Sequence, residues 1–279
     1  MGIVHISQVK QGDRLEQDVL TSRSNTLLLK GTILSPREIE LLQAFLISKV
    51  HIESSEEDEE QSESTADSGR INSNDSALAL YEQYDLLYSL LRRVFSLANS
   101  GGTLPVLEIR TRLESLLTHI QEYNVLFFRP PKYTPQEYLF HHSIRVAMTS
   151  YVLAKWQGYQ AKDLIPIAQA GLMHDIGNAR IDPSLLIKTT SLTAAEFEEV
   201  RSHTIIGYNI LKNVAGYNEG TKLVSIQHHE REDGSGYPFG IMGAKIHPYS
   251  KIVAIADIFH AMSTNRLYRK AVSPYLVLE

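Results

Sequence analysis

The stretch of sequence that most constrains this chain spans residues 228–238 and reads His228-His229-Glu230-Arg231-Glu232-Asp233-Gly234-Ser235-Gly236-Tyr237-Pro238. It joins two adjacent imidazoles and a carboxylate to a turn built from two glycines and a proline. Eight of the chain's eleven histidines fall between His141 and His260, and one of them, His174, is followed directly by Asp175. Imidazole and carboxylate ligands suit Mn, Fe, Co, Ni or Zn. The stretch therefore indicates one edge of a metal site.

The composition narrows the choice of class and partner. The 279-residue chain has a formal net charge of −5 and contains no cysteine. Disulfides and thiolate metal sites are thus excluded, and no global positive field favours a nucleic acid polymer or an anionic membrane. No apolar run approaches the roughly 20 residues that a membrane-spanning helix needs, and the N-terminus lacks a signal pattern. We therefore expect a cytoplasmic protein.

The chain divides into three segments of different composition. Residues 1–53 combine short β-type stretches with a helix opened by Ser35-Pro36, which predicts a small N-terminal α+β domain. Residues 54–76 are rich in Glu, Asp, Ser and Asn, so they predict a flexible acidic linker, with an acidic docking segment as the alternative. From residue 77 to 279 apolar residues recur mostly at helical spacing, as in Leu80, Tyr84, Leu87 and Leu91. Helix starts are predicted at Asp163, at Asp182-Pro183 and at the capping-box pair Thr193 and Glu196. The expected fold class is mainly α, a helix bundle after the small domain.

Two polar sites interrupt apolar helices. Asp257 lies within an apolar run, residues 251–262, where an unpaired carboxylate is costly. A salt bridge to an arginine is the alternative to a metal there. His174 and Asp175 end another apolar helix, where simple helix termination is the alternative. Taken together with His142, His203 and the pair at 228–229, these groups favour a metal centre that hydrolyses phosphoesters.

Five motifs, in this order along the chain, resemble the HD-GYP family. They are Phe140-His141-His142-Ser143-Ile144-Arg145-Val146, then His174-Asp175-Ile176-Gly177, then Arg201-Ser202-His203, then residues 228–238, and finally the run from Ala256-Asp257 to Asn265-Arg266-Leu267-Tyr268-Arg269. The resemblance covers roughly residues 135–275. Residues 12–34 are also similar to a small domain that often precedes such modules.

The resemblance implies an HD-type helix bundle that hydrolyses cyclic di-GMP to linear pGpG or GMP. The attacking group would be a hydroxide held between two divalent metal ions, Fe or Mn, with Zn, Ni and Co as alternatives. Asp175 would bridge the two metals, and Glu230 would orient an imidazole. The full ligand set implied by position is His142, His174, Asp175, His203, His228, His229 and Asp257.

The resemblance also implies residues that handle the substrate. Asp175 and Asn178 take the catalytic positions, while Arg266 and Arg269 would bind phosphate. Gly236 and Tyr237 would shape the pocket or contact regulatory proteins such as diguanylate cyclase domains. The alternative for the two arginines is a solvated helix end, and the alternative for Gly236 and Tyr237 is a plain surface turn. A homodimer is a further expectation.

Three positions depart from the family pattern. Asn178 stands where a lysine is usual, Tyr138 where members with three metals carry glutamate, and His260 where a second aspartate is common. Tyr138 therefore favours two metals, and we expect His260 to pack rather than to bind. Asn178 and His260 leave one alternative, a degenerate module that binds the dinucleotide or a protein without turnover. Hydrolysis of another phosphoester is a further alternative, because the resemblance implies that HD-type sites also act on nucleotides and other phosphoesters. The resemblance also implies a further helix after Glu279.

Overall fold

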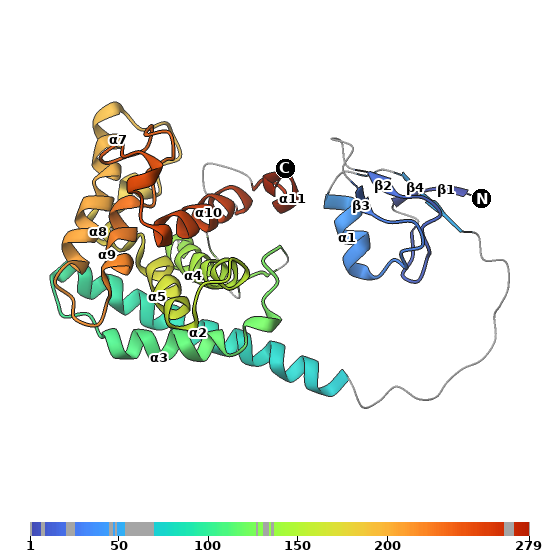
Figure 1. The fold of residues 1–279 in the computed structure, drawn as a ribbon, viewed down its shortest axis with the longest axis horizontal. Coiled ribbons are helices and arrows are strands. Elements are labelled where there is room, and N and C mark those ends of the chain that lie inside the picture. Colours follow the sequence, from blue (N-terminus) through green and yellow to red (C-terminus); the bar gives the residue numbers. More distant parts are fainter. Residues whose placement is uncertain are drawn as a thin grey trace. The chain divides into compact units, whose positions relative to one another are not determined.

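The computed structural model describes residues 2–6, 9–20, 26–44, 47, 49–53, 70–126, 128–130, 134, 137–264 and 271–278. The chain divides into two compact units, Met1–Ala66 with Val272–Glu279 (the N-terminal unit) and Asp67–Ala271 (the helical unit). Figure 1 shows the elements of both. The segment Val272–Glu279, with α11 (Pro274–Leu278), thus groups with the N-terminal unit, whereas the sequence assigned it to the helical domain.

The N-terminal unit has the predicted α+β character. Strand β1 (Gly2–His5) pairs antiparallel with β4 (Lys49–Ile52), and β2 (Val19–Leu20) pairs antiparallel with β3 (Thr26–Leu28). Helix α1 (Pro36–Ala44) begins at the proline that the sequence placed at its first position. These elements enclose a small apolar core formed by Leu15, Val19, Leu34, Leu42, Val50 and Ile52.

The helical unit begins earlier than the sequence indicated. Helix α2 spans Arg70–Ser100, so its first turns occupy residues 70–76, which were predicted to belong to the flexible linker. These residues show little apolar periodicity, because the stretch Arg70-Ile71-Asn72-Ser73-Asn74-Asp75-Ser76 is mostly polar. Helix propagation adds one hydrogen bond per residue, so a helix nucleated by packing farther along can extend into such a stretch. The rest of the predicted linker, residues 54–69, lies outside the described residues.

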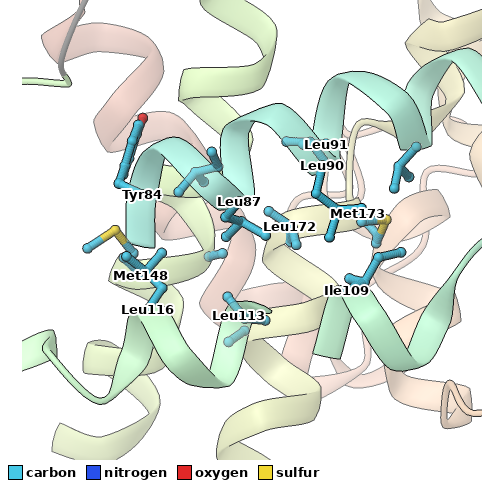
Figure 2. Packing of buried hydrophobic residues seen from close by; sticks show 14 of the residues in the cluster. Tyr84, Leu87, Leu90, Leu91, Ile109, Leu113, Leu116, Met148, Leu172 and Met173 are labelled. Carbon is cyan, nitrogen blue, oxygen red and sulfur yellow. The ribbon is translucent and has the colours of Figure 1, made fainter. Parts of the chain in front are cut away.

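The first core of the helical unit lies where α2, α3 (Val106–Leu117), α4 (Tyr138–Trp156) and α5 (Ala161–Met173) meet. In Figure 2, Leu87 of α2 lies near Leu113 of α3 and Leu172 of α5. Leu80, Tyr84, Leu87 and Leu91 recur at the spacing of one helix face and are all buried, as their periodicity predicted. This core anchors α4 and α5, which carry residues of the candidate site.

A second core brings the last long helix to the same place. Helix α9 (Glu219–Gln227) and α10 (Pro248–Ser263) pack on α4 and α5 through small and branched residues, including Val146, Ile167, Val224 and Val253. Between α5 and α9 lie η4 (Ile176–Arg180), α6 (Pro183–Leu186), α7 (Ala194–Arg201) and α8 (His203–Leu211). The remaining short helices are η2 (Ile120–Glu122) and η5 (Gly243–Lys245).

Two of the three helix starts predicted within the helical unit are confirmed. Thr193 and Glu196 form the predicted capping box on α7, and the Asp182 side chain accepts a hydrogen bond from the backbone N–H of Ser184 at the start of α6. Asp163, predicted as a cap, instead lies in the first turn of α5 and accepts a hydrogen bond from the Tyr249 hydroxyl at 2.6 Å. No helix in the described part of the chain is both long and apolar enough to cross a membrane.

Candidate metal centre

The predicted ligands lie at or near helix ends, except on α4 and α10. His174 is the residue after α5 and Asp175 the residue before η4, while His203 opens α8 and His228 follows α9. His142 and Asp257 lie within α4 and α10, which the second core holds together. The fold therefore gathers side chains from all five motifs.

One group of potential ligands consists of His142, His174 and Asp257, all buried. The Nε2 atom of His142 lies 2.9 Å from Oδ1 of Asp257. The Nε2 atom of His174 is buried with no hydrogen-bond partner among the described residues, and Oδ2 of Asp175 lies 3.4 Å from it. A buried nitrogen left in this way costs free energy unless a ligand meets it.

The other group consists of Asp175, His203, His228 and His229. Oδ1 of Asp175 lies 3.3 Å from Nε2 of His203 and 3.6 Å from Nε2 of His228. His229 is farther out, with its Nδ1 3.9 Å from Oδ2 of Asp257. The structure thus brings all seven predicted ligands together in two groups, and Asp175 turns one oxygen toward each.

Backbone carbonyls fix the orientation of three of these imidazoles. Nδ1 lies 2.8 Å from the Gly171 carbonyl in His174, 2.6 Å from the Val200 carbonyl in His203 and 2.9 Å from the Val224 carbonyl in His228. A carbonyl only accepts, so each Nδ1 carries a proton, and each ring in its neutral form has its lone pair on Nε2. Such outer partners are usual for metal-binding histidines because they fix the tautomer. These residues fit divalent cations.

The charges of the site also suit cations. Burial lowers the pKa of His142 and of His228, which keeps both imidazoles in the neutral form that binds metal. Burial alone would raise the pKa of Asp175, but the surrounding histidines, His174 first, hold it well below its usual range. Burial alone would also raise the pKa of Asp257, but the neighbouring His142 outweighs it, so this pKa is lowered as well. Both carboxylates are therefore ionised at neutral pH.

Gly177 permits the close approach of η4 and α8. A Cβ atom at this position would lie 1.9 Å from the carbonyl oxygen of His203 and 2.7 Å from the backbone nitrogen of Gly207. No side chain fits there without moving α8. The glycine that follows the His174-Asp175 pair therefore allows Asp175 and His203 to meet.

The turn formed by Gly236-Tyr237-Pro238, called the GYP turn below, is held by Glu230, and this corrects the role expected for that residue. Among the described residues no imidazole donates to Glu230. Its Oε1 accepts from the N–H of Phe239 at 2.8 Å and its Oε2 from that of Ile241 at 3.1 Å. Gly236 lies against the same segment, since a Cβ there would come within 2.4 Å of the Glu230 Cα. The peptide bond between Tyr237 and Pro238 is cis. The carboxylate thus closes the turn instead of serving the ligands.

Tyr237 supports the centre from outside. Its ring stacks on the His229 imidazole, with centroids 4.6 Å apart and planes 29° apart. The Arg201 guanidinium lies 4.5 Å from the centroid of the same ring. The expected role of Tyr237 in shaping the pocket is therefore joined by a contact with a candidate ligand, which the sequence analysis did not foresee.

A cavity of about 780 Å³ opens onto the two groups. His142, Asp175, Asn178, His203, His229 and Asp257 line it, and Tyr237 and Arg231 also contribute. The remaining wall is largely apolar and includes parts of α10, of α6 and of the segment that joins α6 to α7, with Leu186, Ile187 and Met262 among its members. Sequence analysis missed the 183–192 wall because this segment carries no charged or metal-binding motif beyond Lys188.

Residues 123–276, more than half of the chain, match the model of the HD domain family. The chain belongs to the HD domain family. The motifs from His141 to Tyr237 all fall within the matched residues, as the HD-GYP resemblance predicted.

Curated relatives match about half of the chain. The cyclic di-GMP phosphodiesterase response regulator RpfG of Xanthomonas campestris pv. campestris (strain 8004) is 34% identical over 128 residues, which cover 46% of this chain and 34% of that protein. The cyclic di-GMP phosphodiesterase of Thermotoga maritima is 38% identical over 130 residues, covering 46% and 35%. The 3'3'-cGAMP-specific phosphodiesterase 1 of Vibrio cholerae is 36% identical over 137 residues, covering 49% and 32%. The matched part spans about a third of these relatives.

Positions that depart from the HD-GYP pattern lie next to the centre. The Tyr138 hydroxyl is 2.9 Å from Nδ1 of His142, where a glutamate would offer a ligand. His260 belongs to neither ligand group; its Nε2 is 2.7 Å from the Thr149 hydroxyl, so it packs as expected. His141 contacts Tyr84, with its Nδ1 3.0 Å from the hydroxyl, and also points away from the ligands. Arg266 and Arg269, the predicted phosphate contacts, lie outside the described residues.

Proposed function

We propose that this chain is a metal-dependent phosphodiesterase that hydrolyses cyclic di-GMP to linear pGpG or GMP. The observation that carries the proposal is the position of Asp175, whose two oxygens face two separate ligand groups on the wall of one cavity. The cavity volume of about 780 Å³ lies within the usual range for small-molecule sites. The names of the curated relatives point to the same class of substrate.

The chain's own residues would divide the work as follows. His142, His174 and Asp257 would hold one divalent cation, and His203, His228 and His229 the other, with Asp175 shared. We propose two divalent ions, either Fe or Mn, and Zn, Ni and Co also suit these donors. Such cations, when bound, activate water as a nucleophile and neutralise charge on the phosphate. His142 and His228 are neutral and both carboxylates are ionised at neutral pH, so these groups are already in the ligating form, whereas His174 must first lose a proton.

The test is hydrolysis by purified protein loaded with Mn²⁺ or Fe²⁺, with products resolved by chromatography. Cyclic di-GMP and 3'3'-cGAMP are compared as substrates, because relatives named for each are similar to this chain. We expect linear products, and their loss in His174→Ala and Asp175→Ala. Glu114→Gln, an exposed ion-pair residue on α3, is the matched control that should keep full activity. No product from either dinucleotide with any of the five metals would rule out the phosphodiesterase.

A second candidate function is binding of the dinucleotide without turnover. Asn178 motivates it, because this residue lines the cavity with an amide where the family usually has a charged lysine. A tight complex that is never cleaved, together with cleavage gained in Asn178→Lys, would favour this alternative. Turnover by the unmodified chain would exclude it.

A further inference from the structure

We infer that Arg231 supplies the positive charge that binds the substrate's phosphate in this cavity, in place of the cation missing at Asn178. The inference rests on the proposed function and adds a residue to it. Arg231 lines the same cavity as Asp175, Asn178 and Tyr237. A guanidinium is planar and always protonated, and its fork matches two phosphate oxygens at once.

The sequence around Arg231 suggests that its charge is cancelled, because it is flanked by Glu230, Glu232 and Asp233. In the structure, however, each of these three carboxylates interacts with a group other than Arg231. Glu230 accepts from the backbone N–H groups of Phe239 and Ile241, and Glu232 pairs with Lys251 at 2.9 Å. Asp233 accepts from the backbone and the hydroxyl of Ser235.

Arg231 is instead held by neutral groups. Its Nη1 donates to the carbonyls of His228 at 3.4 Å and Glu230 at 3.2 Å, and no carboxylate among the described residues lies within ion-pair distance of it. These carbonyls orient the guanidinium without cancelling its charge. Its half-buried position limits competition from water.

Besides Arg231, the described cavity wall contains one lysine, Lys188, and its charge is already neutralised by an ion pair. Lys188 donates to both carboxylate oxygens of Glu196 at 2.7 Å each. Glu196 is itself fixed by the capping box of α7, so this pair is part of the local fold. Among the described lining residues, Arg231 is therefore the permanent cation left for an anionic ligand.

Arg231→Met tests the inference, with Arg231→Lys as a milder variant and Arg110→Met on α3 as the control. Turnover and affinity for cyclic di-GMP are measured together, with metal content and thermal unfolding as checks. We expect KM or Kd to rise about tenfold to a hundredfold in Arg231→Met, the factor expected for a lost charge-assisted hydrogen bond. Metal content and kcat should change little. Arg231→Lys should lose less, and Arg110→Met nothing.

Two outcomes would overturn the assignment. Unchanged KM and Kd in Arg231→Met, beside an active wild-type protein, would remove Arg231 from the substrate site and leave the phosphodiesterase standing. Loss of kcat and metal together would make Arg231 a support of the His228 segment instead. A wild-type protein that neither cleaves nor binds the dinucleotide would be a failure of the proposed function itself, visible before any variant is compared.

Discussion

The Nε2 atoms of His203 and His228 lie 3.3 Å apart, and in both rings Nδ1 is engaged by a backbone carbonyl. Two lone pairs therefore face each other unless a proton or a cation lies between them. This contact would link the backbone geometry of α8 and α9 to metal binding, because a divalent cation held by both histidines and Asp175 would relieve the repulsion.

Metal should stabilise the folded protein. A ligand that binds only the native state at a hundredfold excess over its Kd adds about 2.7 kcal/mol per site. For a unit of this size that corresponds to a rise in Tm of about 5–10 °C. Scanning calorimetry with Mn²⁺ and after chelation measures it. His203→Ala should lose a large part of the rise, and an equal rise in His203→Ala would show that the stabilising cation binds elsewhere.

Metal binding should release a proton near neutral pH. Burial alone would lower the pKa of His174, but the carboxylate of Asp175 beside it raises the pKa to about 9. His174 in the metal-free protein is therefore protonated at pH 7.5, and a cation must displace that proton. Apparent affinity should rise with pH up to about 9 and level off above it. Calorimetry at pH 7.5 in buffers of different ionisation enthalpy counts the proton; identical heats in every buffer would contradict this account.

Gly177→Ala should separate η4 from α8. The added Cβ would meet the His203 carbonyl at 1.9 Å, so we expect a loss of about 1–3 kcal/mol in unfolding free energy or more, as for other overpacked sites. Gly207→Ala on the facing helix is the graded comparison, since its nearest contact would be 3.3 Å. Urea unfolding measures both. Equal costs for the two variants would argue against close packing at Gly177 as the constraint.

Glu230→Gln should loosen the GYP turn. An amide can accept at only one end, so one of the N–H groups of Phe239 and Ile241 loses its partner, at a cost of about 1–3 kcal/mol. Urea unfolding and limited proteolysis of residues 231–241 report the change. Glu232→Gln, whose side chain is 69% exposed, should cost at most about 1 kcal/mol. A turn equally protected in both variants would remove Glu230 from this role.

Local signals in the sequence predicted much of the molecule. The apolar spacing of Leu80 to Leu91 gave a buried helix face, and Thr193 with Glu196 gave a helix start. Ligand types and motif order predicted the members of the centre, because His174 and Asp175 end one apolar helix and Asp257 lies within another, and all belong to motifs in the HD-GYP order. What was missed depends on contacts between distant positions. Glu230 follows the histidine pair, but its partners are nine and eleven residues away, and only the folded turn brings them together.

Anomalous diffraction from crystals grown with Mn²⁺ would reveal the proposed bridging role of Asp175 between two cation sites. We expect two peaks, one on either side of the Asp175 carboxylate. One should be bound by His142, His174 and Asp257, and the other by His203 and His228 with His229. A single peak, or peaks that leave Asp175 uncoordinated, would contradict this role.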